Sequence, residues 1–134
     1  MQLRTRLRTG EAGGGTYIPQ GDYIMEALKS TLRKYDKCQL ECDGLTRVLH
    51  TVLVRLNYSH TVMVGSITLG LMRFSPHFWI ELPDGRIVDY RARMWLGRKA
   101  QHGIFKQSLV VYAGEPIEWE PLSDALFNIL TKGA

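Results

Sequence analysis

The sequence predicts an α+β protein in which N-terminal helices pack on an antiparallel β-sheet. Two apolar stripes with helical spacing come early in the chain, and later segments alternate between apolar and polar residues between short turns. Helices followed by hairpin-linked strands are typical of an α+β layer fold. The chain has 134 residues, of which 45% are hydrophobic and 22% charged, so one domain with a buried core is expected.

We expect residues 1–20 to form a mobile segment, because a basic start is followed by the glycine-rich run G-E-A-G-G-G. Residues 21–134 then form the single domain. No apolar run approaches the roughly 20 residues of a membrane span, and no apolar signal-peptide core follows the basic start. These features predict a cytoplasmic protein that does not bind membranes.

Two helices are predicted from their apolar stripes. The first is expected over Asp22–Tyr35, with Asp22 as its N-cap. The second is clearer, because apolar residues recur at helical spacing throughout Leu45–Leu56 and place Cys42 in the first helical turn. Asn57 directly follows this stripe and suits the left-handed position that ends a helix.

The middle of the chain predicts a set of strands. Thr61–Leu69 is β-branched and apolar, so a strand is expected there, followed by a loop over Gly70–Pro76. A second strand is expected over His77–Leu82 and its antiparallel partner over Arg86–Tyr90. The turn between them is Pro83–Gly85.

The last third of the chain has weaker patterns. Arg91–Lys106 has no clean period, although Met94–Leu96 suggests a short helix or a packed loop. A strand is expected over Ser108–Tyr112, ending at the following Ala-Gly pair. Pro121 suits the first position of a final helix whose apolar residues extend to Leu130.

The two cysteines differ in their expected surroundings. Cys38 and Cys42 have neither the spacing of a redox pair nor enough companions for a zinc site, so no metal or other cofactor is expected. Cys38 is interpreted as a small buried apolar residue. Cys42 would face the positive end of a helix dipole, which favours a thiolate.

The register of the predicted hairpin decides whether His77 and Asp89 can meet. A two-residue turn would send Asp89 to the opposite face of the sheet. Pro83 and Gly85 favour a three-residue turn, with Gly85 in the left-handed position. Trp79 then lies opposite Asp89, and Asp89 shares a face with His77 at one diagonal step, within reach of a hydrogen bond.

The other histidines are weaker candidates for a base. His50 flanks the apolar stripe of the second helix. His60 is expected in a loop before a strand, where it could lie near the site. His102 has no acidic neighbour in the sequence.

A cysteine at the head of an apolar helix, then a strand, then H-F-W-I-E-L-P-D-G-R-I-V-D from His77 to Asp89, resembles the transglutaminase-like branch of the papain-like superfamily. The resemblance covers roughly residues 40–97. The short chain and the Cys42-to-Asp89 spacing are most similar to small bacterial members, which include the lasso-peptide leader peptidases. Asp43-Gly44 departs from the pattern, because many relatives have larger or less charged residues after the cysteine.

The resemblance implies a papain-like core and a thiol enzyme that transfers an acyl group from a peptide or protein amide. Cys42 would attack the amide, His77 would carry the proton and Asp89 would orient the imidazole. The oxyanion donors would be the Cys42 backbone N–H and one side chain, with Gln39 and Trp79 as candidates. Transfer to water would make a protease or amidase, and transfer to an amine a transglutaminase; the sequence leaves both open.

The competing interpretation is an inactive relative that binds a partner protein or nucleic acid through an arginine-rich face. Arg91, Arg93 and Arg98 would form this face. The net charge of +4 is a mild excess that permits nucleic-acid binding without requiring it, so nucleic acid is the less favoured partner.

Overall fold

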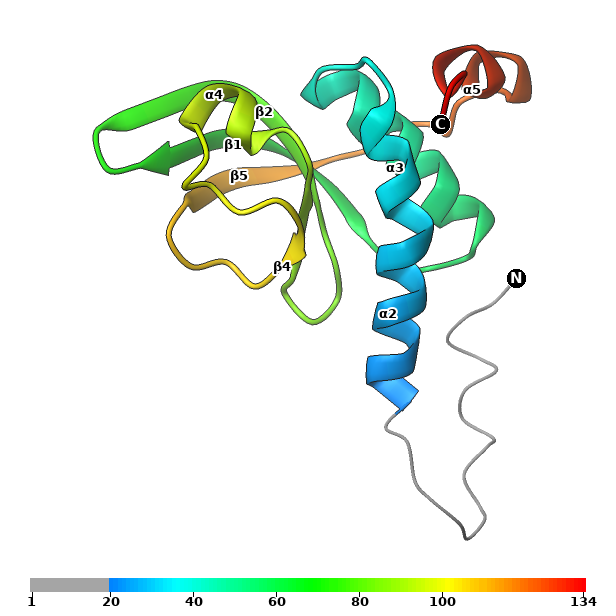
Figure 1. The fold of residues 1–134 in the computed structure, drawn as a ribbon, viewed down its shortest axis with the longest axis horizontal. Coiled ribbons are helices and arrows are strands. Elements are labelled where there is room, and N and C mark those ends of the chain that lie inside the picture. Colours follow the sequence, from blue (N-terminus) through cyan, green and yellow to red (C-terminus); the bar gives the residue numbers. More distant parts are fainter. Residues whose placement is uncertain (1–19) are drawn as a thin grey trace, which may run out of the picture.

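The computed structural model describes residues 20–134, which form an α+β fold (Figure 1). In chain order, its elements are α2 (Gln20–Arg33), the 3₁₀ helix η1 (Lys34–Lys37), α3 (Cys42–Arg55), β1 (Thr61–Leu69), β2 (Met72–Glu81), β3 (Ile87–Asp89), α4 (Ala92–Leu96), β4 (Gly103–Phe105), β5 (Val111–Ile117) and α5 (Asp124–Leu130). The predicted mobile segment, residues 1–20, lies outside the described residues apart from Gln20.

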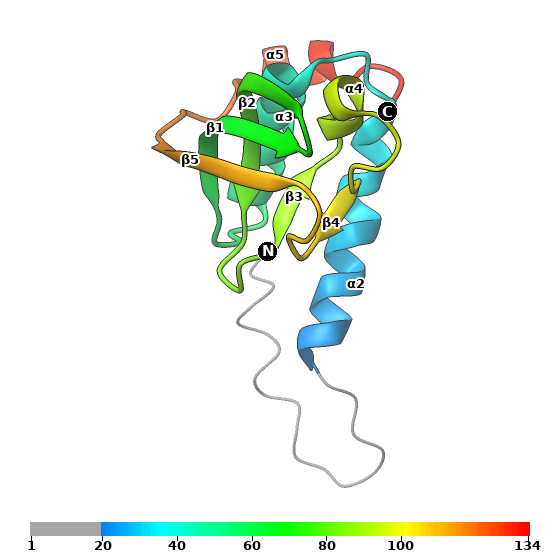
Figure 2. The same cartoon turned by 90° about the vertical axis from the view of Figure 1, so that its left-hand side faces the viewer.

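The five strands form one antiparallel sheet in the order β4-β3-β2-β1-β5, which Figure 2 shows side by side. The predicted α+β class with an antiparallel sheet is therefore confirmed. The helices α2 and α3 pack against one face of the sheet, and the short helix α4 contacts β1 and β2. Strand β5 forms one edge, next to β1, and β4 forms the other.

The predicted helices are largely confirmed. Helix α3 begins at Cys42, and Asn57 has a φ of 55°, the left-handed conformation expected after the helix. The prediction for Asp22 is wrong, because α2 already begins at Gln20 and Asp22 lies in its first turn. The apolar stripe begins only after Asp22, so the pattern could not mark the first turn. The predicted end at Tyr35 falls in η1, where the helix tightens.

The predicted loop over Gly70–Pro76 is wrong, because β2 already begins at Met72. Pro76 cannot donate a hydrogen bond to a neighbouring strand and therefore suggested a loop. In the structure it lies where the register between β1 and β2 shifts, between the pairs Gly65–His77 and Ile67–Phe74. A bulge of this kind accommodates a proline within an inner strand.

The end predicted for the last strand is also wrong, because β5 starts at Val111 and continues through Gly114 to Ile117. Gly114 lies opposite Gly65 of β1. A Cβ atom on Gly114 would lie 2.3 Å from the carbonyl oxygen of Val64 and 2.8 Å from the Trp79 ring. The glycine is therefore required by the close approach of β1 and Trp79, and it does not end the strand.

The strand β4 was not predicted, and the final helix is shorter than expected. Helix α5 begins at Asp124, because Ser123 provides its N-cap and its hydroxyl accepts the backbone N–H of Leu126 at 3.2 Å. Pro121 lies in the segment before this cap.

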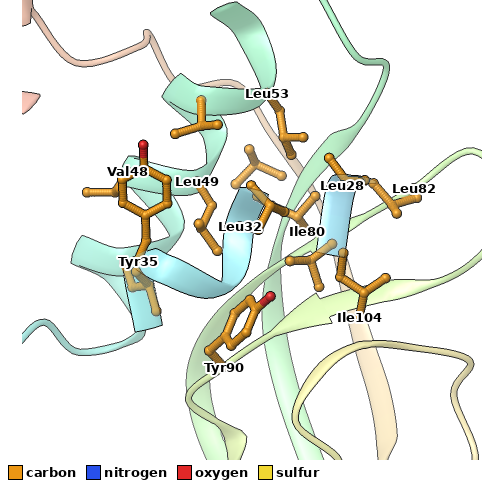
Figure 3. Close-up of a cluster of buried hydrophobic side chains, with 14 of the residues drawn as sticks. Leu28, Leu32, Tyr35, Val48, Leu49, Leu53, Ile80, Leu82, Tyr90 and Ile104 are labelled. Carbon is orange, nitrogen blue, oxygen red and sulfur yellow. The ribbon is translucent and has the colours of Figure 1, made fainter. Parts of the chain in front are cut away.

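The main core lies between the helices and one face of the sheet, where Figure 3 shows side chains of α2 and α3 meeting those of β2. Its labelled members are Leu28, Leu32, Tyr35, Val48, Leu49, Leu53, Ile80, Leu82, Tyr90 and Ile104. Two smaller clusters lie elsewhere, one under α4 around Ile67 and Leu96 and one around Trp79 and Ile87. Ile80 and its neighbour Trp79 therefore belong to different clusters, as strand alternation requires.

A histidine pair ties the C-terminal segment to α3. His50 Nδ1 lies 2.7 Å from His60 Nε2, and His50 Nε2 lies 2.7 Å from the carbonyl oxygen of Trp119. His60 Nδ1 lies 2.8 Å from the carbonyl oxygen of Tyr58. Because carbonyl oxygens only accept, the outer nitrogen of each ring is the donor in its contact with the carbonyl oxygen.

We expect Gly114→Ala to lower the free energy of unfolding by about 1–3 kcal/mol, because the new methyl group overlaps β1 and Trp79. Gly44→Ala is the matched control. Its Cβ would be 3.3 Å from the flexible Leu40 side chain in a helix where alanine is favoured, so the change should stay below about 1 kcal/mol. Urea unfolding followed by circular dichroism measures both. Equal stability of Gly114→Ala and the parent protein would contradict the close approach.

Candidate active site

Cys42 is the first residue of α3, so its side chain lies at the positive end of the helix dipole. The residue before it, Glu41, takes the N-cap position without a side-chain capping bond. Asp43 accepts the backbone N–H of Gly44 at 2.8 Å, and its carboxylate is therefore engaged by the backbone of its own helix turn. The acidic neighbour that departs from the resembled pattern thus has a local structural role.

The predicted three-residue turn is confirmed. Gly85 has a φ of 90°, and its N–H donates to the Leu82 carbonyl at 2.9 Å. The N–H of Leu82 donates to the carbonyl of Arg86, also at 2.9 Å. The strands then pair Ile80 with Val88, which places the preceding Trp79 opposite Asp89. This register turns Asp89 toward the face that carries His77.

His77 and Asp89 form a buried pair. The ring nitrogen Nε2 of His77 donates to Oδ2 of Asp89 at 2.7 Å, and both side chains are almost fully removed from solvent. The other carboxylate oxygen, Oδ1, accepts the backbone N–H of Arg91 at 2.8 Å. A buried carboxylate costs free energy unless donors surround it, and here both oxygens are satisfied.

Tyr112 adds a third donor that sequence reasoning missed. Its hydroxyl donates to Asp89 Oδ2 at 2.8 Å from the edge strand β5. Burial, with the charge and hydrogen bond of Asp89, raises the pKa of Tyr112 far above its usual range, so the phenol remains a donor. No local signal marks Tyr112, because its contact with Asp89 depends on the pairing of strands distant in sequence.

The second nitrogen of His77 is the one available to Cys42. Nε2 is taken by Asp89, whereas Nδ1 is buried without a hydrogen-bond partner among the described residues. Burial of the ring disfavours its charged form, but the Asp89 hydrogen bond and charge, together with the neighbouring Cys42, outweigh it and raise the pKa of His77 to about 9. The Cys42 thiol is therefore near the ring, although it does not form a hydrogen bond with Nδ1 in this arrangement.

The two cysteines are both buried and differ in what surrounds them. Cys42 is 7% exposed and Cys38 is 4% exposed, so accessibility does not separate them. Burial raises the pKa of the Cys38 thiol, although the positive charge of Arg91 and a backbone hydrogen bond act in the opposite direction. Cys38 packs in the main core. This agrees with its interpretation as a small buried apolar residue.

Arg91 connects the segment before Cys42 to the strand that carries Asp89. Its guanidinium donates to the carbonyl oxygens of Asp36, Cys38 and Leu40 at 3.0, 2.8 and 2.6 Å, and to the Tyr90 carbonyl at 2.8 Å. It also forms an ion pair with the Asp36 carboxylate at 2.6 Å. The side chain thereby fixes the path of the chain into α3.

The expectation that Arg91 belongs to an exposed docking face is wrong, because Arg91 is 9% exposed and its donors are used inside the protein. Arg93 is exposed but donates from Nε to the Ala100 carbonyl at 2.7 Å. Arg98 is exposed. The predicted three-arginine face is therefore reduced to two residues.

The two candidate oxyanion donors have different surroundings. Gln39 is exposed and lines a cavity of about 380 Å³ together with Cys38, Leu40 and Glu41 from the same segment. Trp79 is fully buried, and its indole N–H has no hydrogen-bond partner among the described residues. Gln39 can therefore reach a bound molecule from this cavity, whereas Trp79 is enclosed by protein.

The remaining histidines lie in other contacts. His102 Nε2 is 2.8 Å from Asp36 Oδ2, an acidic partner distant in sequence. His60 pairs with His50, and this pair lines a separate cavity of about 510 Å³ with Trp119. Within residues 20–134, no group of three or more His, Cys, Asp or Glu side chains is arranged to hold a metal ion.

Comparison of the chain with protein-family models, with curated proteins and with solved structures found no match. Among the described residues, no helix is both long enough and apolar enough to cross a membrane.

The His77 ring should titrate with a midpoint near pH 9 in an NMR titration of its ring protons. Asp89→Asn removes the carboxylate charge but leaves the ring buried, so the midpoint should fall by about 1 to 3 pH units. Asp84→Asn, the same substitution in the exposed turn, should leave it unchanged. A His77 midpoint that does not respond to Asp89→Asn would contradict the buried pair.

Arg91→Lys should lower the free energy of unfolding by about 3 kcal/mol, because an ammonium group cannot replace a guanidinium bonded to several carbonyl oxygens. Arg98→Lys makes the same change at an exposed position and should stay within about 0.5 kcal/mol. Chemical unfolding of the two variants provides the comparison. Equal effects would show that the Arg91 contacts are not what holds the segment before Cys42.

Proposed function

We propose that this protein is a thiol enzyme that transfers the acyl group of a peptide or protein amide through Cys42, His77 and Asp89. The observation that carries the proposal is the buried His77–Asp89 hydrogen bond, which leaves His77 Nδ1 for a cysteine at a helix start. A nucleophile, a base and a group that orients the base are the parts of nucleophilic acyl transfer.

The first step forms a thioester. The Cys42 sulfur attacks the amide carbonyl carbon, and the thiol proton moves to His77 Nδ1. When the C–N bond breaks, Nδ1 returns the proton to the departing amine. Asp89 holds Nε2–H throughout, so Nδ1 remains the nitrogen that exchanges the proton. The raised pKa of His77 favours the imidazolium that this sequence of steps requires.

The second step transfers the acyl group from sulfur to an acceptor. Water, deprotonated by His77, would release the acid, and an amine would form a new amide. The protein is therefore proposed as a protease or amidase, or as a transferase of the transglutaminase type.

The negative charge on the carbonyl oxygen requires donors. The backbone N–H of Cys42 is at the start of α3, where N–H groups have no carbonyl partner within the helix. Gln39 is proposed as the side-chain donor, because it lines the cavity beside the segment that leads into Cys42. Trp79 is the less favoured candidate, since a substrate could contact its indole N–H only after the surrounding core opened.

A papain-like, transglutaminase-like core is part of the same proposal. It is supported by a helix that begins at Cys42 and by antiparallel neighbours β2 and β3 that carry His77 and Asp89. The alternative of an inactive binding protein is less favoured, because the burial of Arg91 removes part of the proposed docking face.

Cys42 should react with iodoacetamide near pH 7 at least about 10-fold faster than Cys38, because only Cys42 has a basic ring beside it. Peptide mapping by mass spectrometry after timed alkylation gives both rates. In His77→Ala, the Cys42 rate should fall toward that of Cys38. Equal rates in the parent protein would remove the evidence for an activated thiol.

The function itself is tested with a defined peptide library, incubated with the protein with and without an added amine and analysed by mass spectrometry. The parent protein and Cys38→Ala should produce hydrolysed or amine-linked products. Cys42→Ala should produce none, and Asp89→Asn should lower turnover by roughly 10⁴-fold. Products that persist in Cys42→Ala would reject the proposed nucleophile.

A further inference from the structure

Helix α4 exposes two large apolar side chains close to the candidate site. Met94 is 49% exposed and Trp95 is 36% exposed, whereas Ala92 and Leu96 of the same short helix are buried beneath them. The buried pair packs in the apolar cluster that includes Ile67 of β1. Large apolar side chains gathered on a surface commonly mark a binding site.

Trp95 is connected to the proposed catalytic base through one aromatic ring. Phe74 of β2 stacks on Trp95 with ring centroids 3.9 Å apart and planes 5° from parallel. Phe74 also meets the His77 ring edge-on, with centroids 6.1 Å apart and planes at 79°. The stacked rings of Phe74 and Trp95 therefore extend from the His77 ring to the protein surface. The stacking fixes the orientation of Trp95.

Met94 lies near the segment that leads into Cys42. It lines the cavity of about 380 Å³ that also contains Gln39, Leu40 and Glu41, the residues directly before Cys42. The apolar surface thus adjoins both the segment that leads to the nucleophile and, through Phe74, the base. A thioether is flexible and polarisable, so Met94 can adapt to side chains of different shapes.

We propose that Phe74, Met94 and Trp95 form a binding site for a large apolar side chain of the peptide substrate, close to the amide that is cleaved. This inference rests on the proposed function. The occupant is assigned as substrate because Phe74 contacts the His77 ring and Met94 lines the cavity that contains Gln39, the proposed oxyanion donor. Of the two acidic residues in the cavity wall, Asp36 and Glu41, Asp36 is already paired with Arg91 and His102.

Burial of a leucine or phenylalanine side chain against this surface should accelerate reaction by about 10- to 100-fold relative to a charged side chain. The probes are peptidyl acyloxymethyl ketones that carry Leu, Phe, Gly, Asp or Lys at the two positions before the reactive ketone. Cys42 displaces the acyloxy group, so a C–S bond forms and a carboxylate leaves. The second-order rate of Cys42 modification is measured by intact-protein mass spectrometry.

Trp95→Ala and Met94→Ala are the test variants, and Leu126→Ala is the control, because Leu126 of α5 is 47% exposed and outside the site. Iodoacetamide reports whether Cys42 itself is intact in each protein. We expect the parent protein and Leu126→Ala to prefer Leu or Phe at one position by at least 10-fold. In Trp95→Ala the preference among the probes, each rate divided by the iodoacetamide rate of the same protein, should fall below about 3-fold.

Three outcomes would overturn the inference. Equal rates with all peptidyl probes would leave a reactive Cys42 without this binding site, and the proposed function would stand. A preference that survives in both test variants would place apolar recognition elsewhere. A change in oligomeric state of Trp95→Ala by size-exclusion chromatography, with probe preference intact, would assign the surface to a second copy of the chain. If iodoacetamide modifies Cys42 but no peptidyl probe does, the proposed function itself fails.

Discussion

The buried carboxylate of Asp89 is the group on which the candidate site depends. It accepts from the ring of His77, the hydroxyl of Tyr112 and the backbone of Arg91. These donors come from β2, from β5 and from the segment directly after β3, so one side chain joins two strands to the segment that precedes α4. Removing the charge of Asp89 would leave the buried His77 ring without the partner that raises its pKa.

Arg91, two residues after Asp89, complements it. Its backbone holds the carboxylate, while its side chain holds the carbonyl oxygens of the segment that leads into α3. The placement of Cys42 relative to His77 is therefore determined by contacts of residues 89–91 rather than by α3 alone. A buried guanidinium is retained at such a position because it bonds several carbonyl oxygens in a fixed geometry.

Local chemistry explains what the sequence could predict. The Pro83–Gly85 turn sets the register that brings Asp89 to the face of His77, and the apolar stripe of α3 places Cys42 at its start. Predictions failed where the structural role of a residue depends on a contact with a residue distant in sequence. Pro76 is accommodated by a bulge against β1, and Gly114 continues β5 because Gly65 faces it.

The site showed the same division between local and distant determinants. Tyr112 could not be found from the sequence, because β5 approaches Asp89 only through its pairing with β1. Arg91 was predicted on the surface, because runs of arginine are usually solvated, and the carbonyl oxygens that bury it lie more than 50 residues earlier in the chain. Such contacts depend on the assembled fold.

The central claim is that Cys42, His77 and Asp89 act as one unit. A double-mutant cycle tests it through the rate of Cys42 acylation by a small activated ester in the parent protein, His77→Ala, Asp89→Asn and the double variant. If Asp89 acts only through His77, each single change lowers the rate, and the double variant reacts no more slowly than His77→Ala. If the two effects multiply, or if Asp89→Asn leaves the rate unchanged, the three residues do not form the proposed unit.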